Sequence, residues 1–132
     1  MRRIVALTTA LSLATVLPAP TTAEALTGRC VKWEPLMITH APRGGWDVAR
    51  MSRYCWRESR GLPYIVNARG GDTGLFQVHP ITWRYLSQRL GVPMSSMQRW
   101  LKNPTNNVRA AAALCEFGRR AFHDCYQPWR TH

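Results

Sequence analysis

Four cysteines, at positions 30, 55, 115 and 125, constrain what this chain of 132 residues can fold into. An even number of cysteines in a short exported chain is typical of a disulfide framework, so we expect two disulfides. A zinc site is the alternative, but the sequence has no Cys-x-x-Cys step and no histidine three or four residues from a cysteine. No metal is therefore expected.

The first 25 residues have the order of a secretory signal peptide. Two arginines precede an almost uncharged run from Ile4 to Leu17, and the small-residue step Ala-Glu-Ala ends at Ala25. The run is shorter than the roughly 20 residues that a membrane span needs. We predict cleavage after Ala25, a secreted or extracytoplasmic location, and one domain over residues 26–132. An uncleaved N-terminal anchor is the alternative.

The chain is strongly basic, with a formal net charge of +11 that falls to about +10 without residues 1–25. Such a domain is expected to associate with polyanions, which include nucleic acid, anionic lipid and acidic wall polymers. The charge alone does not choose among them. The basic residues occur singly and not in the blocks of a nucleic-acid-binding tail, so no specific nucleic-acid partner is predicted.

The residue pattern predicts a mainly α-helical domain with a small β-hairpin or loop region. Asp47 is a candidate N-cap for a helix that runs to about Arg60, and Gly61 is its expected terminator. Further helices are predicted from Pro80 to the residue before Gly91, over residues 94–101, and over residues 106–117. Residues 30–40 are expected to form about one helical turn before a break at 41–45. Short β-favouring pieces at 65–66 and 75–78 flank a turn at 69–72.

Helical spacing also suggests how the cysteines pair. Cys55 lies on the predicted inner face of the first long helix, and Cys115 lies on an alanine-rich face of the last one. If those faces pack together, Cys55 pairs with Cys115, and Cys30 is left to pair with Cys125. All three connectivities of four cysteines remain open at this point.

Glu58 is placed against a local rule. It lies in the last turn of its predicted helix, at the negative end of the helix dipole, where a carboxylate is unfavourable. Residues that break a local rule often have a functional reason. Such a position in a partly desolvated cleft favours the protonated acid, which is the form that a general acid needs. The alternative is a solvated glutamate paired with Arg57.

Asp72 is the second candidate carboxylate. It stands in Gly-Gly-Asp-Thr-Gly, where aspartate is also simply a favoured turn residue. Asn67 and Gln77 nearby are candidates for hydrogen bonds to a ligand or are ordinary surface amides. None of the four histidines has the serine or cysteine arrangement of a nucleophilic site, so nucleophilic catalysis by such a residue is poorly supported.

Three sequence blocks occur in order: Glu58-Ser59, the pentapeptide Gly74-Leu-Phe-Gln-Val78, and the run from Asn107 to Leu114. Together they resemble the lysozyme-like superfamily, especially the soluble lytic transglycosylase type of murein-degrading domain, over about residues 47–129. The resemblance implies that Glu58 closes a helix and is the general acid. It also implies that the Gly-Leu-x-Gln block forms the small β region of the cleft and that the helix from Asn107 packs behind the catalytic helix.

The resemblance therefore implies an α+β lysozyme-like fold and a secreted enzyme that degrades peptidoglycan. The expected reaction cleaves the β-1,4 bond between N-acetylmuramic acid and N-acetylglucosamine, with Glu58 as general acid and base. Asp72 assists if hydrolysis is of the lysozyme type, and is not needed if the muramic 6-hydroxyl attacks internally. The expected substrate-binding residues are Ser59, Asn67, Gly74, Phe76, Gln77, Tyr126 and Trp129.

The expected partners are peptidoglycan glycan strands and anionic wall polymers, with a monomeric protein and no cofactor. A second hypothesis is a non-catalytic, basic wall-binding module on a lysozyme-like scaffold. A third, a small basic nuclease, lacks the expected catalytic histidine pairing.

Overall fold

A computed structural model describes residues 22–130, so most of the predicted leader, residues 1–21, lies outside the described residues. The described chain is mainly helical, which confirms the predicted fold class. The helices are α1 Thr22–Thr27, α2 Glu34–Gly44, α3 Val48–Ser59, α4 Trp83–Leu90, α5 Met97–Leu101 and α6 Pro104–Phe122. Short 3-10 turns lie at η1 Val31–Trp33, η2 Pro80–Thr82, η3 Met94–Ser96 and η4 Gln127–Trp129. None of the helices within residues 22–130 is long and apolar enough to cross a membrane.

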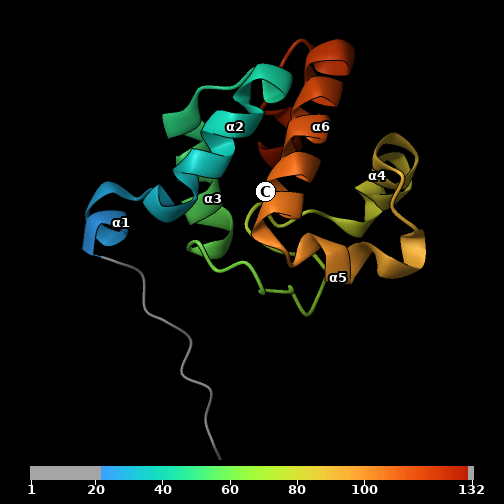
Figure 1. Cartoon of the computed structure of the whole chain (residues 1–132), viewed down its shortest axis with the longest axis horizontal. Helices are drawn as coiled ribbons and strands as arrows, with labels where there is room; N and C mark the ends of the chain where they lie inside the picture. The colour runs from blue at the N-terminus through green and yellow to red at the C-terminus, as the bar shows by residue number, and fades with distance from the viewer. Residues whose placement is uncertain (1–21, 131–132) are drawn as a thin grey trace, which may run out of the picture.

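Helix α6 is the central element of the fold. It begins after Asn103, whose side chain accepts a hydrogen bond from the backbone N–H of Asn106, and Pro104 occupies its first turn. The four alanines from Ala110 to Ala113 are completely buried, and their small side chains let α2 approach closely. Helices α2 and α3 lie on one side of α6, and α4 lies on the other (Figure 1).

Helix α3 follows the sequence prediction closely. The Asp47 side chain caps it by accepting a hydrogen bond of 2.7 Å from the Arg50 backbone N–H. Met51 and Cys55 point into the core and are fully buried. The helix ends where Arg60 adopts a left-handed conformation (φ 55°), one residue before the predicted terminator Gly61.

The prediction for residues 30–45 is wrong in extent. In place of one helical turn, η1 and the 11-residue helix α2 occupy this segment, and α2 passes through Pro42 before Gly45 ends it at φ 64°. Pro42 lies in the last turn of α2, so the helical bond that it cannot donate to the Ile38 carbonyl is lost only near the end of the helix. Packing of α2 against α6 supplies stabilisation that the local sequence does not reveal.

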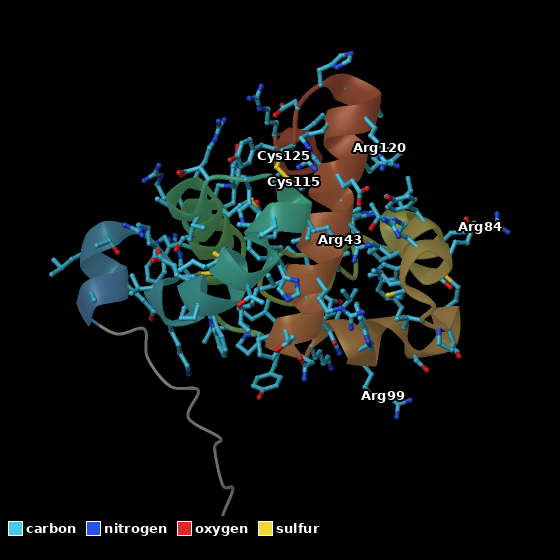
Figure 2. All side chains as sticks on the ribbon, turned by 45° about the horizontal axis from the view of Figure 1, so that its top comes forward. Arg43, Arg84, Arg99, Cys115, Arg120 and Cys125 are labelled. Atoms are coloured by element: carbon cyan, nitrogen blue, oxygen red, sulfur yellow. A yellow bond between two sulfur atoms is a disulfide. The ribbon has the colours of Figure 1, made fainter. Side chains whose placement is uncertain are left out.

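The suggested cysteine pairing is also wrong. The disulfides join Cys30 to Cys55 and Cys115 to Cys125 (Figure 2 shows the second pair). The Cys30 backbone N–H donates to the Ser52 carbonyl at 3.2 Å, so the chain before α2 lies against α3 and reaches Cys55 first. After α6 the chain reverses at a left-handed residue, position 123, and returns at once to Cys115.

The predicted β-hairpin is present only as an irregular turn. Single antiparallel bridges join Val66 to Thr73 and Thr73 to Val78, and no longer strand forms within residues 22–130. The segment 61–79 runs from the end of α3 to η2 and places this turn near the beginning of α6, as Figure 1 shows.

A charged cluster joins three helices on the opposite end of the core. Glu116 on α6 pairs with Arg120 at 2.8 Å, with Arg89 of α4 at 3.3 Å and with Arg43 of α2 at 3.7 Å. Burial alone would raise the pKa of Glu116, but the positive charges of the three arginines hold that pKa below its usual value. The cluster therefore stabilises the fold while Glu116 is ionised.

Candidate active site

Glu58 lies in the last turn of α3, as the sequence predicted. Its side chain is only 12% exposed and is paired with its neighbour Arg57. Arg57 donates from Nε at 3.0 Å and from Nη2 at 2.6 Å, and both hydrogen bonds fall on the same carboxylate oxygen, Oε1. The carboxylate is thus shielded from solvent and held in one orientation.

Arg57 joins Glu58 to the C-terminal end of the chain. Its guanidinium also donates to the backbone carbonyl of Trp129 in η4, and it lies over the Tyr54 ring at 4.7 Å from the ring centre. One side chain therefore connects the end of α3 to a residue that is 72 positions away in the sequence.

The turn over residues 73–78 is fixed to α6 by the buried side chain of Asn107. This amide donates to the carbonyls of Thr73 and Leu101, and it accepts from the Phe76 N–H, each at 2.9 Å. Gly74 is needed at the point of contact, because a Cβ there would collide with the Asn107 amide and the Leu101 carbonyl. The Gly74–Val78 block of the sequence thus has a packing role.

Gln77 and Ser59 are occupied by contacts within the protein. The Gln77 amide donates to the carbonyls of Ile65 and Gly74, at 3.2 and 3.0 Å. Ser59 is 2% exposed, donates to the Cys55 carbonyl and accepts from the backbone N–H of Gly61. Ser59 therefore holds the backbone at the end of α3, and Gln77 holds the turn to the Ile65 segment.

Phe76 and Trp129 form a buried pair beneath the site. They are 0% and 3% exposed, their ring centres are 5.9 Å apart, and the Trp129 indole N–H donates to the Phe76 carbonyl at 3.1 Å. Rings this well buried offer no face to a sugar in this structure. Their contacts instead place the Trp129 carbonyl where Arg57 reaches it.

Tyr126 and Asn67 make their side-chain hydrogen bonds to residues other than Glu58. The Tyr126 hydroxyl accepts from the backbone N–H of Asp47, at the first turn of α3, whereas Glu58 is in the last. Eleven residues of helix separate the two positions by about 16 Å along the axis. Asn67 is exposed, and its side chain accepts from the Arg69 N–H within the same turn.

Asp72 is partly buried and faces a histidine. Its Oδ1 accepts no hydrogen bond from the described residues, and His79 Nε2 lies 3.8 Å from it. The other imidazole nitrogen of His79 accepts from the Ile81 N–H at 3.0 Å, which leaves Nε2 as the nitrogen that carries a proton toward Asp72. Asp72 therefore belongs with His79, and the two carboxylates have separate basic partners.

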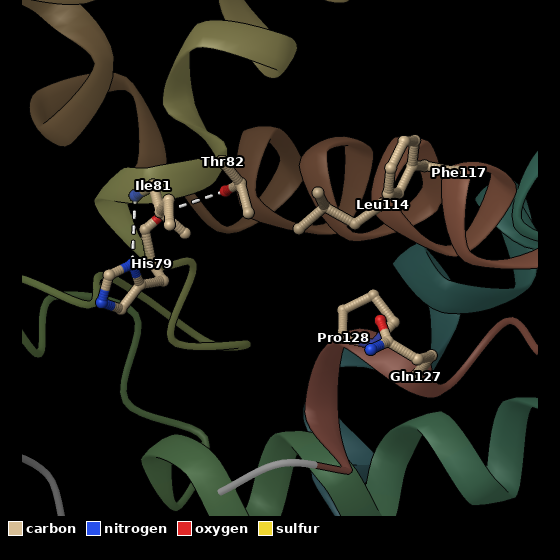
Figure 3. A pocket seen from close by; sticks show the side chains of 7 residues that line it. All are labelled: His79, Ile81, Thr82, Leu114, Phe117, Gln127 and Pro128. Atoms are coloured by element: carbon tan, nitrogen blue, oxygen red, sulfur yellow. Dashed lines mark hydrogen bonds between the residues drawn. The ribbon is translucent and has the colours of Figure 1, made fainter. Parts of the chain in front are cut away.

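Two pockets open beside these partners. Arg50, Arg53, Tyr54 and Arg57 line one of about 300 Å³ on the exposed face of α3. The other, of about 290 Å³, lies between η2, α6 and η4 and is mostly apolar (Figure 3). Its lining residues are His79, Ile81, Thr82, Leu114, Phe117, Gln127 and Pro128. Neither Glu58 nor Asp72 lines these two pockets, but Arg57 and His79 do.

Sequence reasoning treated Arg57 only as an ordinary ion-pair partner and did not identify the arginine pocket. Positions 50, 53 and 57 recur at intervals of three and four residues, and that spacing predicts that their side chains share one face of a helix. The signal was therefore present in the sequence. The bond from Arg57 to the Trp129 carbonyl leaves no such pattern.

A helix that ends in a shielded glutamate, followed by a small β turn that is anchored to a long alanine-rich helix, is the arrangement of the lysozyme-like glycan-cleaving domains. The comparison with protein families agrees: the model of the transglycosylase SLT domain matches residues 50–124, more than half of the chain. The protein belongs to this family, which implies a peptidoglycan-degrading function of the lytic transglycosylase type in general. No curated protein matches the chain.

Proposed function

We propose that the protein is a secreted enzyme that cleaves the β-1,4 bond between N-acetylmuramic acid and N-acetylglucosamine, with Glu58 as general acid and base. One observation carries the proposal. Within the segment that matches the family, Glu58 closes α3 as a carboxylate that is 12% exposed and fixed by Arg57. Shielding from water and fixed orientation are what a general acid needs.

The geometry suggests which oxygen holds the proton. Both hydrogen bonds from Arg57 fall on Oε1, so Oε2 is the oxygen that would carry the proton. Glu58 gives this proton to the glycosidic oxygen as the bond from C1 of the muramic residue breaks, and N-acetylglucosamine leaves as an alcohol. The muramic 6-hydroxyl then attacks C1 and returns its proton to Glu58. The product is a 1,6-anhydro sugar, and no second carboxylate takes part.

Asp72 would distinguish this route from hydrolysis. In a lysozyme-type reaction a second carboxylate stabilises the oxocarbenium-like centre or attacks it. Asp72 is held near His79 at 3.8 Å, in the separate environment described above, and we propose that it has a supporting role in the turn. Asp72→Asn is then expected to retain most of the activity, whereas a lysozyme-type mechanism predicts a severe loss.

The direct test replaces Glu58 by glutamine, which keeps the shape of the side chain and removes the transferable proton. Glu58→Gln is expected to lower the rate of clearing of murein suspensions by at least about a hundredfold. Glu34→Gln is the matched control, because Glu34 also pairs with an arginine, Arg29 at 2.6 Å, and lies at the start of α2. Retained activity in the folded Glu58 variant would exclude the mechanism. Mass spectrometry of the products separates anhydro ends from reducing ends.

The predicted leader is part of the proposal. Cleavage after Ala25 would fall inside α1 and would remove Glu24, which is buried and accepts a hydrogen bond from the Lys32 N–H at 3.2 Å in the uncleaved chain. N-terminal sequencing of protein recovered from outside the cell tests the cleavage site directly. Size-exclusion chromatography tests the proposed monomer.

A non-catalytic, wall-binding role is the second candidate. Two observations favour it: Arg57 already neutralises the Glu58 carboxylate, and three arginines line an open pocket next to it. Such a module would bind murein in a strongly salt-dependent manner and would release no soluble sugar. Release of muropeptides by the wild-type protein, and not by the Glu58 variant, decides against this role.

A further inference from the structure

The pocket on α3 gathers three arginines, of which only Arg57 is paired with an acidic residue of the described chain. We call the pocket lined by Arg50, Arg53, Tyr54 and Arg57 the arginine pocket. Its three guanidinium groups come from successive turns of one helix, and its volume is about 300 Å³. Like charges held this close repel one another, so an anion placed among them would be attracted by all three.

Aromatic rings hold two of these guanidinium groups in place. Arg50 lies 3.9 Å from the centre of the Tyr126 ring, and Arg57 lies 4.7 Å from that of Tyr54. The two tyrosine rings stack on each other with their centres 5.6 Å apart. The arrangement is rigid because Tyr126 is in turn bound to the start of α3 through its hydroxyl. Stacking leaves the N–H edges of a guanidinium available to a ligand.

The Arg53 side chain makes no hydrogen bond or ion pair with any described residue, and it is exposed. Arg50 stacks on Tyr126, but like Arg53 it has no acidic side-chain partner among the described residues. Arg57 is shared, because it lines the pocket and also holds Glu58. The pocket thus has two unoccupied guanidinium groups and one that touches the proposed catalytic carboxylate.

We propose that the arginine pocket is a subsite for the free carboxylates of murein stem peptides. The proposal rests on the proposed function, because it places the peptide relative to the bond that Glu58 cleaves. Stem peptides are attached to the lactyl group of the muramic residue whose C1 bond breaks, so their carboxylates lie within the reach of one short peptide from that bond. Guanidinium groups bind carboxylates through paired, charge-assisted hydrogen bonds, which gives the subsite its chemistry.

The test compares two double variants that remove the same charge. R50Q/R53Q changes the pocket and leaves Arg57 and Glu58 intact. R84Q/R99Q is the control, because Arg84 and Arg99 project from α4 and α5, on the side of α6 away from α3 (Figure 2). Each protein is assayed by co-sedimentation with intact murein and with peptide-free glycan strands prepared by amidase digestion. Steady-state kinetics on both substrates separate KM from kcat, and thermal unfolding confirms that each variant is folded.

The expected result is a loss of affinity for intact murein of about tenfold or more in R50Q/R53Q, because charge-assisted hydrogen bonds are removed. The loss should appear in KM and not in kcat, and should vanish on peptide-free strands. R84Q/R99Q should bind both substrates nearly as the wild type does. The single variant Arg53→Gln should lose less than the double variant and in the same direction.

Equal losses in the two double variants would overturn the proposal, because they would indicate general charge attraction. A loss that persists on peptide-free strands would overturn it as well. Murein from which phosphate-bearing polymers have been stripped provides a third arm, and a loss that disappears with those polymers assigns the pocket to phosphate and refutes the carboxylate assignment. Co-sedimentation does not need catalysis, so failure of the Glu58 mechanism would leave this test readable.

Discussion

The side chain of Asn107 offers the sharpest test of how the site is built. It is fully buried, and its three hydrogen bonds hold the turn at residues 73–78 against α6. Asn107→Leu keeps the approximate volume and removes all three bonds. The Phe76 N–H and the Leu101 carbonyl would then be left buried without these partners, whereas the Thr73 carbonyl keeps its bond from the Val78 N–H.

The magnitude follows from those two groups. Each buried polar group that loses its partner costs about 1–3 kcal/mol, so the variant should lose about 3 kcal/mol of unfolding free energy. For a domain of this size that corresponds to a fall in Tm of roughly 12 °C. Circular dichroism during urea and thermal unfolding measures both quantities. Amide hydrogen exchange should also show loss of protection at Phe76.

Asn106→Leu is the matched control for this prediction. Asn106 is the preceding residue on α6, is half-buried, and its amide makes one hydrogen bond of 3.2 Å to the Trp100 carbonyl. Its replacement should cost less than about 1 kcal/mol. If the two variants unfold within about 3 °C of each other, Asn107 does not anchor the turn and the reasoning is refuted.

Two further substitutions test the same frame. Gly74→Ala should destabilise the protein by more than Gly91→Ala. Both glycines have a positive φ (81° and 69°), but only the Cβ at position 74 would collide with Asn107 and a backbone carbonyl, whereas the space at position 91 is open. Urea unfolding of the two variants therefore separates the cost of steric collision from that of backbone strain. Glu116→Gln should flatten the pH dependence of stability in acid. Because the pKa of Glu116 is lowered in the folded state, the unfolded chain takes up the proton first as the pH falls. The stabilisation that Glu116 gives to the folded state is therefore present at neutral pH and is lost as the pH falls below about 4. Unfolding free energies measured between neutral and acid pH check this, and equal slopes in both proteins would count against it.

Local signals were enough to predict much of the fold. Asp47 acts as the predicted side-chain N-cap of α3, and Gly91 ends α4 in the left-handed conformation. Each of these features depends on a few adjacent residues, which is why the sequence reveals them. The placement of Glu58 at the end of α3 follows from the same local rules.

Features set by tertiary contacts were not predictable in this way. The length of α2 depends on packing against α6, and the cysteine pairs depend on where the chain returns in space. The burial of Phe76 and Trp129 has no periodic signature, because both residues lie in irregular segments. The position of Glu58 in the last turn of α3 was therefore predictable, whereas the contacts that surround it were not.

Helix α6 anchors the two segments that contain Phe76 and Trp129. Near one end, Asn107 fixes the turn that contains Phe76, and eight residues further along Cys115 fixes the tail that contains Trp129. The tail and the turn contact each other through the Trp129 indole and the Phe76 carbonyl. Arg57 donates hydrogen bonds both to the Trp129 carbonyl of the tail and to the Glu58 carboxylate. The orientation of the Glu58 carboxylate therefore depends, through Arg57, Trp129 and Phe76, on two attachment points on a single helix.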